Sequence, residues 1–235
     1  MSRYDLYYWS GIQGRGEFVR LVLEELDIAY TDVGRKLGDG RLQRALGDEA
    51  FAVPLLKEPG TELVVAQTAN ITRFLGERHG LAPADERGRL IASTIALTVA
   101  DFVNEVHDTH HPSSVEIAYE QQKAAAAVRA EAFRDGRLPK FFGYFEGLLA
   151  GGPYVVGDTL SYADLAVWQA YAGASYAFPR AVASLAGHAK RLRAHHARIA
   201  KRPRIAAYLK SRRRLAFNEM GIFRHYPELD AKVKK

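Results

Sequence analysis

The beginning of the chain alternates short apolar runs with one longer amphipathic stretch. Residues 4–9 read Tyr-Asp-Leu-Tyr-Tyr-Trp, an aromatic-rich run that predicts a strand, and a turn containing three glycines follows it. From Gly16 to residue 26 apolar side chains recur with a period of about 3.6 residues, which predicts a helix with a broad buried face. A second apolar run at residues 28–33 predicts another strand. The chain therefore opens with a β-α-β pattern.

Two further apolar runs predict a β-hairpin. Residues 53–56 and 62–65 flank a Pro-Gly-Thr sequence at residues 59–61, which has the residue types of a tight turn between antiparallel strands. A helix is predicted at residues 67–78, and Gly80 stands just past it, where a left-handed C-terminal cap is favoured. With one short helix at 41–46 in the polar segment before the hairpin, the predicted order is β-α-β-α-β-β-α.

The pattern becomes helical near residue 84 and stays so to the end. A short linker is predicted before it, and residues 154–156 are the one candidate strand after it. Ser161 and Asp164 have the spacing of a capping box, which predicts that a helix begins there and assigns both residues to folding. The sequence therefore predicts an α/β domain followed by an all-α domain.

Composition narrows the chemistry. The 235 residues include no cysteine, which excludes disulfides and any thiol nucleophile of the protein's own, so thiol chemistry would need a thiol from outside. No apolar run has the length of about 20 residues that a membrane-spanning helix needs, and the first residues lack the apolar core of a secretion signal. A cytoplasmic protein that does not act at a membrane is expected.

The net charge of +6 raises the question of nucleic-acid binding. The excess of basic residues is concentrated in residues 190–214, where apolar residues are interleaved with them. A solvated face of an amphipathic helix explains this run, so no nucleic-acid partner is expected.

Five separated motifs, in this order, resemble those of the cytosolic glutathione transferases. They are Tyr8-Trp9, Val53-Pro54, Ala-Gln-Thr-Ala-Asn-Ile at residues 66–71, Gly157-Asp158-x-x-Ser161-x-x-Asp164, and Arg202-Pro203-x-Ile205-x-x-Tyr208-Leu209. The resemblance extends over the whole chain and is closest to bacterial-type members of the tyrosine-type mu, pi and sigma classes. Each motif alone is weak, and their order and spacing carry the inference.

The resemblance implies a thioredoxin-like domain that binds glutathione at residues 1–80, a linker at 81–86, and a helical domain at 87–235 that forms the electrophile pocket. It implies a cytoplasmic homodimeric enzyme of detoxification that conjugates the thiolate of its co-substrate glutathione to small hydrophobic electrophiles, without a metal. The alternatives are another glutathione-dependent enzyme of this fold (an isomerase, an ether-cleaving lyase or a peroxidase) and a non-catalytic binding protein.

The same resemblance assigns residues to glutathione. Val53 and a cis Pro54 would pair with its cysteinyl backbone, although Pro54 read from the sequence alone would be trans. Gln67 and Thr68 stand at a helix start, where free N–H groups hold a carboxylate, and by resemblance they would bind the γ-glutamyl group; Thr68 alternatively serves only as an N-cap.

Charged residues are further candidates by resemblance. The glycyl carboxylate needs a cation, for which Lys36, Arg41 and Arg44 are candidates in the polar segment. Glu105 or Asp101 would reach the γ-glutamyl amine across the dimer from the first helix of the second domain, or each is a solvated helix charge.

Activation of the thiol requires a hydroxyl donor, because a thiol with a pKa of about 8.5 is mostly protonated near neutrality. Tyr8 matches the catalytic tyrosine of the family, but its distance to the Gly14-Arg15-Gly16-Glu17 run is one residue longer than the usual spacing. Ser10 is therefore kept as the rival donor, since serine-type members place a hydroxyl just beyond this strand.

The electrophile pocket would be lined from both domains. By resemblance its candidate residues are Trp9, Gly11, Ile12, His107 and His111. The spacing of His107, His110 and His111 on one helical face is compatible with metal ligands, but the sequence suggests no remote fourth ligand. We therefore expect no metal there, and exposed helix surface is the alternative to substrate contact.

Overall fold

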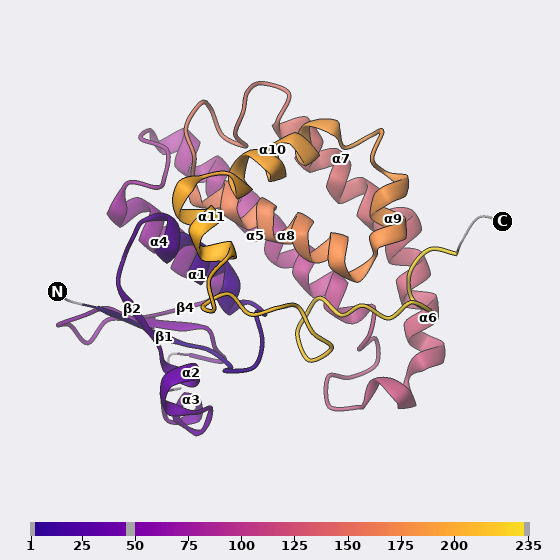
Figure 1. Ribbon diagram of the computed structural model, residues 1–235, viewed down its shortest axis with the longest axis horizontal. Coiled ribbons are helices and arrows are strands. Elements are labelled where there is room, and N and C mark those ends of the chain that lie inside the picture. Colours follow the sequence, from indigo (N-terminus) through magenta and orange to yellow (C-terminus); the bar gives the residue numbers. More distant parts are fainter. Residues whose placement is uncertain (1–2, 46–49, 233–235) are drawn as a thin grey trace.

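The computed structural model describes residues 3–45 and 50–232. Its sheet has four strands in the order β2-β1-β3-β4 (Figure 1). β1 pairs with β2 in parallel and with β3 antiparallel, and β3 pairs antiparallel with β4. The strands are β1 (Tyr4–Tyr7), β2 (Tyr30–Asp32), β3 (Leu55–Lys57) and β4 (Val64–Ala66).

The helices follow the predicted division into a mixed first part and a helical second part. Those of the first part are α1 (Gly16–Glu25), α2 (Val33–Leu37), α3 (Gly40–Ala45) and α4 (Thr68–His79). Those of the second part are α5 (Glu86–Asp108), α6 (Lys123–Ala132), α7 (Leu138–Leu148), α8 (Tyr162–Ala177), α9 (Pro179–Ser184), α10 (Lys190–Ala200) and α11 (Pro203–Leu209), with a 3₁₀ turn η1 (Tyr119–Gln121) and a π-helical turn η2 (Phe133–Arg137). Within the described ranges, no helix is both long and apolar enough to cross a membrane.

Several local predictions are confirmed. The hairpin is present as β3 and β4, and Gly80 caps α4 in the left-handed conformation at φ 77°. Asp164 accepts hydrogen bonds from the backbone N–H and the hydroxyl of Ser161, at 2.8 and 2.9 Å, so the capping box begins α8 as predicted. The carboxylate also accepts from the N–H of Val155 at 2.8 Å and lies 2.9 Å from Nε2 of His195.

Other boundaries were wrong. The first strand ends at Tyr7 rather than Trp9, because the chain turns away there into the glycine-bearing loop. Residues 154–156 form bends rather than a strand, and α2 was not predicted at all. The helix predicted at 41–46 is present as α3, and residue 46 itself falls outside the described residues.

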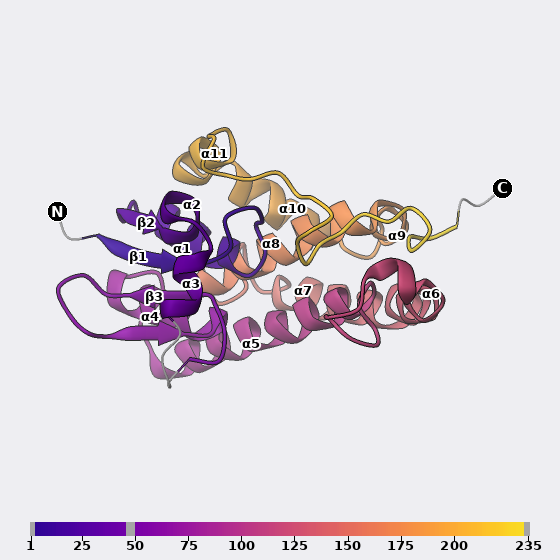
Figure 2. The ribbon, with the colours of Figure 1, turned by 90° about the horizontal axis from the view of Figure 1, so that it is seen from below.

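The two parts of the chain lie side by side, with the N-terminus on the sheet side and the C-terminus at the far end of the helices (Figures 1 and 2). α8 runs through the middle of the helical part and is buried on almost every side, next to α5 and α1. α1 lies between sheet and helices, so one hydrophobic core continues from Leu6 in β1 to Val167 in α8. The start of α1 is therefore fixed by both parts of the protein.

A buried ion network holds that start. Arg20 donates to Asp32 at 2.7 Å and to the carbonyl of Gln13 at 3.2 Å, and it lies 3.4 Å from Glu17. Burial alone would lower the pKa of Arg20, but Glu17 and Asp32 outweigh burial and raise it. Glu17 in turn accepts hydrogen bonds from Tyr208 and from Arg214. Charged groups without water are tolerated only when paired in this way.

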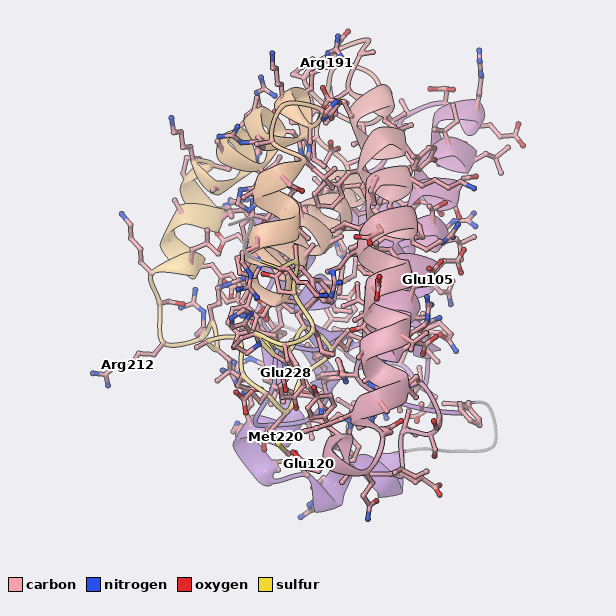
Figure 3. The ribbon with its side chains drawn as sticks, turned by 90° about the vertical axis from the view of Figure 1, so that its right-hand side faces the viewer. Glu105, Glu120, Arg191, Arg212, Met220 and Glu228 are labelled. Atoms are coloured by element: carbon pink, nitrogen blue, oxygen red, sulfur yellow. The ribbon has the colours of Figure 1, made fainter. Side chains whose placement is uncertain are left out.

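Several of the basic residues after residue 200 form ion pairs with acidic residues of the same chain. Four arginines from α11 and its flanks pair with acidic residues of α1 and the turn after it: Arg202 with Glu25, Arg204 with Asp27, Arg213 with Glu24, and Arg214 with Glu17. Arg212, in contrast, projects away from the fold (Figure 3). Much of the basic run therefore serves domain contact, which weakens further the case for nucleic acid.

After α11 the chain runs back along the helical part without forming a helix or strand in residues 210–232 (Figure 2). We call these residues the C-terminal strap. Asn218 donates to the carbonyl of Gly11 at 2.9 Å, and the carbonyl of Leu215 accepts from Gln13 at 2.5 Å. Farther along, Asp230 accepts from Arg180. The strap thus joins the loop after β1 to the far helices.

Candidate functional site

The register of the sheet brings three predicted site residues to one end. Tyr7 lies opposite Leu55 in the β1–β3 pair, and Leu55 lies opposite Ala66 in the β3–β4 pair. One residue farther along each strand, at the same end of the sheet, stand Tyr8, Pro54 and Gln67. The bond between Val53 and Pro54 is cis, as the resemblance predicts.

The first turn of α4 leaves hydrogen-bond donors without partners. Gln67, just before the helix, has φ 69° and ψ 121°, a conformation that costs non-glycine residues of order 1–3 kcal/mol and that is concentrated at functional sites. The first N–H groups of a helix have no intrahelical partner, and the helix dipole adds positive potential there. The buried hydroxyl oxygen of Thr68 also has no hydrogen-bond partner among the described residues.

A cavity of about 290 Å³ opens beside this helix start, between α1, α4 and α5. Its polar lining comes from Arg15, Gln67, Thr68, Asn70, Thr72 and Asn104. Arg15 donates to the side-chain oxygen of Asn104 at 2.6 Å, which fixes its guanidinium at the cavity. Sequence reasoning missed Arg15 and Asn104, because nothing in the chain around either one points to the other.

Tyr8 is held just beyond the end of β1. Its side chain is only 4% exposed, and its hydroxyl accepts a hydrogen bond from the backbone N–H of Arg15 at 2.7 Å. Burial raises the pKa of Tyr8, against smaller lowering contributions from Arg15 and Arg20. The phenol therefore stays protonated at neutral pH, and because its oxygen already accepts from Arg15, its own proton remains available to donate.

Two glycines make room for this ring. A Cβ atom on Gly14 would stand 2.1 Å from the Tyr8 hydroxyl, and one on Gly16 would stand 2.6 Å from the ring. Gly14 also has φ 47°, which favours glycine. The loop with its additional residue thus folds tightly onto Tyr8 and lays the Arg15 amide against the hydroxyl.

Ser10 has other partners. Its backbone N–H donates to Asp39 at 2.8 Å, and its hydroxyl donates to the second oxygen of the same carboxylate at 3.2 Å. The hydroxyl proton is therefore engaged by a full negative charge. This contact lies 29 positions away in the sequence and could not be read from it.

Neither Lys36 nor Glu105 lines this cavity. Lys36 is exposed and lines a separate hollow beside β2 and residues 211–213, and the side chain of Arg44 lies outside the described residues. Glu105, labelled in Figure 3, is held in a two-pronged pair by Arg137 at 2.6 and 2.9 Å. Hydrogen bonding from Arg137 lowers the pKa of Glu105, so its charge is matched within the chain.

Of the residues predicted for the electrophile pocket, Gly11 and Ile12 lie where the loop after β1 meets the strap. Trp9 is 44% exposed, the carbonyl of Gly11 is held by the strap, and Ile12 lies near Gly221. The pKa values of His107 and His110 are lowered, chiefly by burial, to about 4 and about 3. We call His107, His110 and His111 the histidine cluster.

Comparisons with known proteins identify one family. Residues 107–212 match the family model described as glutathione S-transferase, C-terminal domain. A glutathione S-transferase of Plasmodium yoelii yoelii is 28% identical over 207 residues, which cover 86% of this chain and 90% of the relative. Glutathione S-transferase 1 of Ascaris suum is 31% identical over 175 residues, covering 71% of this chain and 78% of the relative.

The architecture is also that of solved transferases. The structure of a Pi-class glutathione S-transferase of Onchocerca volvulus superposes with a TM-score of 0.71 at 23% identity, covering 91% of this chain and 94% of that one. At this identity the similarity shows the fold alone. It confirms the predicted thioredoxin-like domain followed by a helical domain.

The fit between Gly14 and Tyr8 can be tested by adding one carbon. We expect Gly14→Ala to lower the free energy of unfolding in urea by about 1–3 kcal/mol, because the methyl group overlaps the Tyr8 hydroxyl and the backbone is left-handed. Gly11→Ala is the matched control: a Cβ there meets no atom within 4 Å, so a change within about 0.5 kcal/mol is expected. Equal stability of both variants would show that the loop does not hold Tyr8 tightly.

Proposed function

Because the chain belongs to the glutathione S-transferase family, we propose that it joins the thiolate of glutathione to small hydrophobic electrophiles. The proton leaves the thiol, the sulfur attacks an electrophilic carbon, and the electrons pass to a leaving group or into the π-system of the electrophile. In this proposal residues 1–80 hold glutathione, residues 81–86 link the domains, and residues 87–235 shape the electrophile pocket. The proposed reaction is cytosolic and needs no metal.

The observation that carries this proposal is the unpaired Thr68 hydroxyl in the first turn of α4, at the same end of the sheet as Tyr8 and the cis Val53–Pro54 bond. A γ-glutamyl carboxylate there would accept from Thr68 and from the free N–H groups of the turn. The exposed backbone beside Pro54 would pair with the cysteinyl residue of glutathione, as two antiparallel strands pair. Gln67 would complete this part of the site.

The remaining charged groups of glutathione require partners of their own. The glycyl carboxylate needs a cation, and Lys36 and Arg44 are the proposed donors. Arg15 also lines the cavity, where it adds positive charge. Glu105 is the proposed partner of the γ-glutamyl amine, and it would have to share its carboxylate with Arg137.

Tyr8 is the proposed activator of the thiol. A hydrogen bond to a charged group contributes roughly 1.5–3 kcal/mol, which corresponds to about one or two units of thiol pKa. The phenol supports this role because it is protonated and its oxygen is anchored by Arg15. Ser10 is the weaker candidate, because Asp39 accepts its proton. The residues proposed to face the electrophile are Trp9, Gly11, Ile12, His107 and His111.

A second copy of the chain is the proposed partner. The exposed side of α5 carries Leu90 and Leu97, which are 60% and 56% exposed, and Phe51 before β3 is 96% exposed. Exposed apolar side chains on one helix face support burial against another surface. A homodimer would remove these groups from water.

Removal of the Tyr8 hydroxyl tests the activation step. At neutral pH we expect Tyr8→Phe to lower kcat/KM for a standard aromatic electrophile by about 10- to 100-fold, the equivalent of one hydrogen bond to a thiolate. The loss should shrink as the pH rises past about 8.5, where a thiol ionises unaided.

The neighbouring hydroxyls serve as controls in the same assay. Tyr7→Phe and Ser10→Ala are each expected to keep kcat/KM within about twofold, because neither hydroxyl is assigned to the sulfur. A large loss in Ser10→Ala together with normal activity in Tyr8→Phe would transfer the role to Ser10.

Removal of the Thr68 hydroxyl tests glutathione binding. Thr68→Val keeps the shape of the side chain and removes one donor to a carboxylate, so KM for glutathione should rise roughly 10-fold or more while kcat changes little. Thr98→Val is the control, since the Thr98 hydroxyl bonds to the carbonyl of Thr94 on α5. An unchanged KM in Thr68→Val would contradict the assignment of the γ-glutamyl group to this turn.

A further inference from the structure

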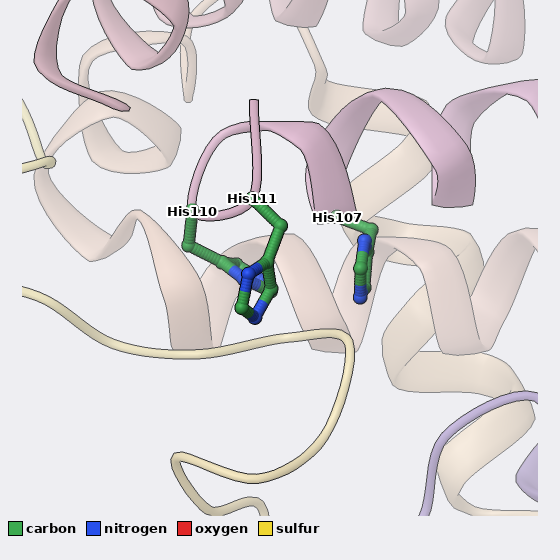
Figure 4. A group of neighbouring side chains, drawn as sticks. All are labelled: His107, His110 and His111. Carbon is green, nitrogen blue, oxygen red and sulfur yellow. The ribbon is translucent and has the colours of Figure 1, made fainter. Parts of the chain in front are cut away.

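Three imidazoles converge at the C-terminal end of α5, and we propose that they form a binding site for one zinc ion. His107 lies in the last turn of α5, and His110 and His111 follow it directly, with the C-terminal strap passing beside them (Figure 4). The ring centroids of the three pairs are 4.8, 4.9 and 5.2 Å apart. This inference concerns metal binding, at a cluster whose His107 and His111 are also among the residues proposed to face the electrophile.

The spacing of the rings suits a tetrahedral ion. With zinc–nitrogen bonds of about 2.0–2.1 Å, the centroids of two coordinated imidazoles lie about 5 Å apart. One nitrogen of each ring already lies within 4.8 Å of the others. Coordination needs about 3.4 Å between nitrogens, so the rings must turn inward without moving apart.

His110 supplies an orphaned ligand atom. The side chain is 1% exposed, and its Nε2 lies 2.8 Å from the carbonyl oxygen of Ile222 in the strap, so this nitrogen carries the proton. Nδ1 then has a lone pair, and it has no partner among the described residues. An imidazole that donates one N–H to a carbonyl and offers its other nitrogen is the usual arrangement of a metal-bound histidine.

The other two rings become ligands by turning. Nδ1 of His111 accepts from Nε2 of Gln122 at 3.0 Å, so in this arrangement Nε2 of His111 carries the proton. The Gln122 amide has two N–H groups and also donates to the carbonyls of Ser114 and Ile117, so it keeps two acceptors when His111 turns to present a lone pair to the ion. No hydrogen bond fixes the ring of His107 within residues 3–45 and 50–232, and its neighbours are the rings of His110 and His111.

The charged residues around the cluster influence which fourth ligand the zinc ion would take. Arg15 lies close to His107, and Arg224 lies close to all three histidines. These cations oppose a bare divalent ion. They favour a site in which the fourth ligand is hydroxide or another anion, which reduces the net charge of the complex.

The test is a zinc titration of the full-length chain without a histidine tag, after removal of metal with a chelator. Isothermal titration calorimetry at neutral pH should give one zinc ion per chain. Cobalt(II) in the same site should give the intense visible absorption of a tetrahedral ion. His107→Ala and His111→Ala should each weaken zinc binding at least about tenfold.

Two controls keep the test sharp. His188→Ala removes an exposed histidine elsewhere and should leave the affinity unchanged. Circular dichroism of the His107→Ala variant checks that its fold is intact, which is expected because no ring hydrogen bond is lost within the described residues. Absence of saturable binding, a weak octahedral cobalt spectrum, or undiminished affinity in His107→Ala would each overturn the proposal.

Discussion

One buried cation, Arg20, connects the elements on which the site depends. It reaches Asp32 in β2, Glu17 in its own helix and the carbonyl of Gln13 in the loop before the helix. Because Gln13 is held in this way, the next residues, Gly14 and Arg15, are laid over the end of β1, where the Arg15 amide meets Tyr8. Removing a partner from such a pair leaves an uncompensated buried charge, which costs several kcal/mol. The position of the Tyr8 hydroxyl is therefore tied to the stability of the interface between sheet and helices.

The proposed site lies between this loop and the first turn of α4, whose hydrogen-bond donors lack partners. Strand register brings Tyr8, the cis Val53–Pro54 bond and the first turn of α4 to one end of the sheet. The unpaired Thr68 hydroxyl and the positive φ of Gln67 each lower the stability of the fold. A bound carboxylate would offset this loss. On the other side of the loop the C-terminal strap holds Gly11 and carries the carbonyl that orients His110. The strap thus links the loop after β1 to the histidine cluster.

The sequence predicted what local chemistry determines. The hairpin around Gly60, the cap at Gly80 and the box formed by Ser161 and Asp164 each depend on neighbours within a few residues, and each is present. Contacts between residues far apart in the sequence could not be predicted from it. The hydrogen bond that engages the Ser10 hydroxyl depends on Asp39, the ion pair of Glu105 depends on Arg137, and the ion pairs of the late arginines depend on acidic residues of α1. The cis form of Pro54 came from family resemblance, since local preference favours trans.

The central claim is that Tyr8 stabilises the thiolate of glutathione bound at the start of α4. The most direct measurement is an ultraviolet titration of the thiolate of bound glutathione in the unsubstituted protein and in Tyr8→Phe. The account predicts a thiol pKa about one or two units below the free value of about 8.5 in the former, and a value near the free one in the latter. An equally lowered pKa in both proteins would contradict the role of Tyr8, and an unshifted pKa in the unsubstituted protein would contradict activation of the thiol altogether.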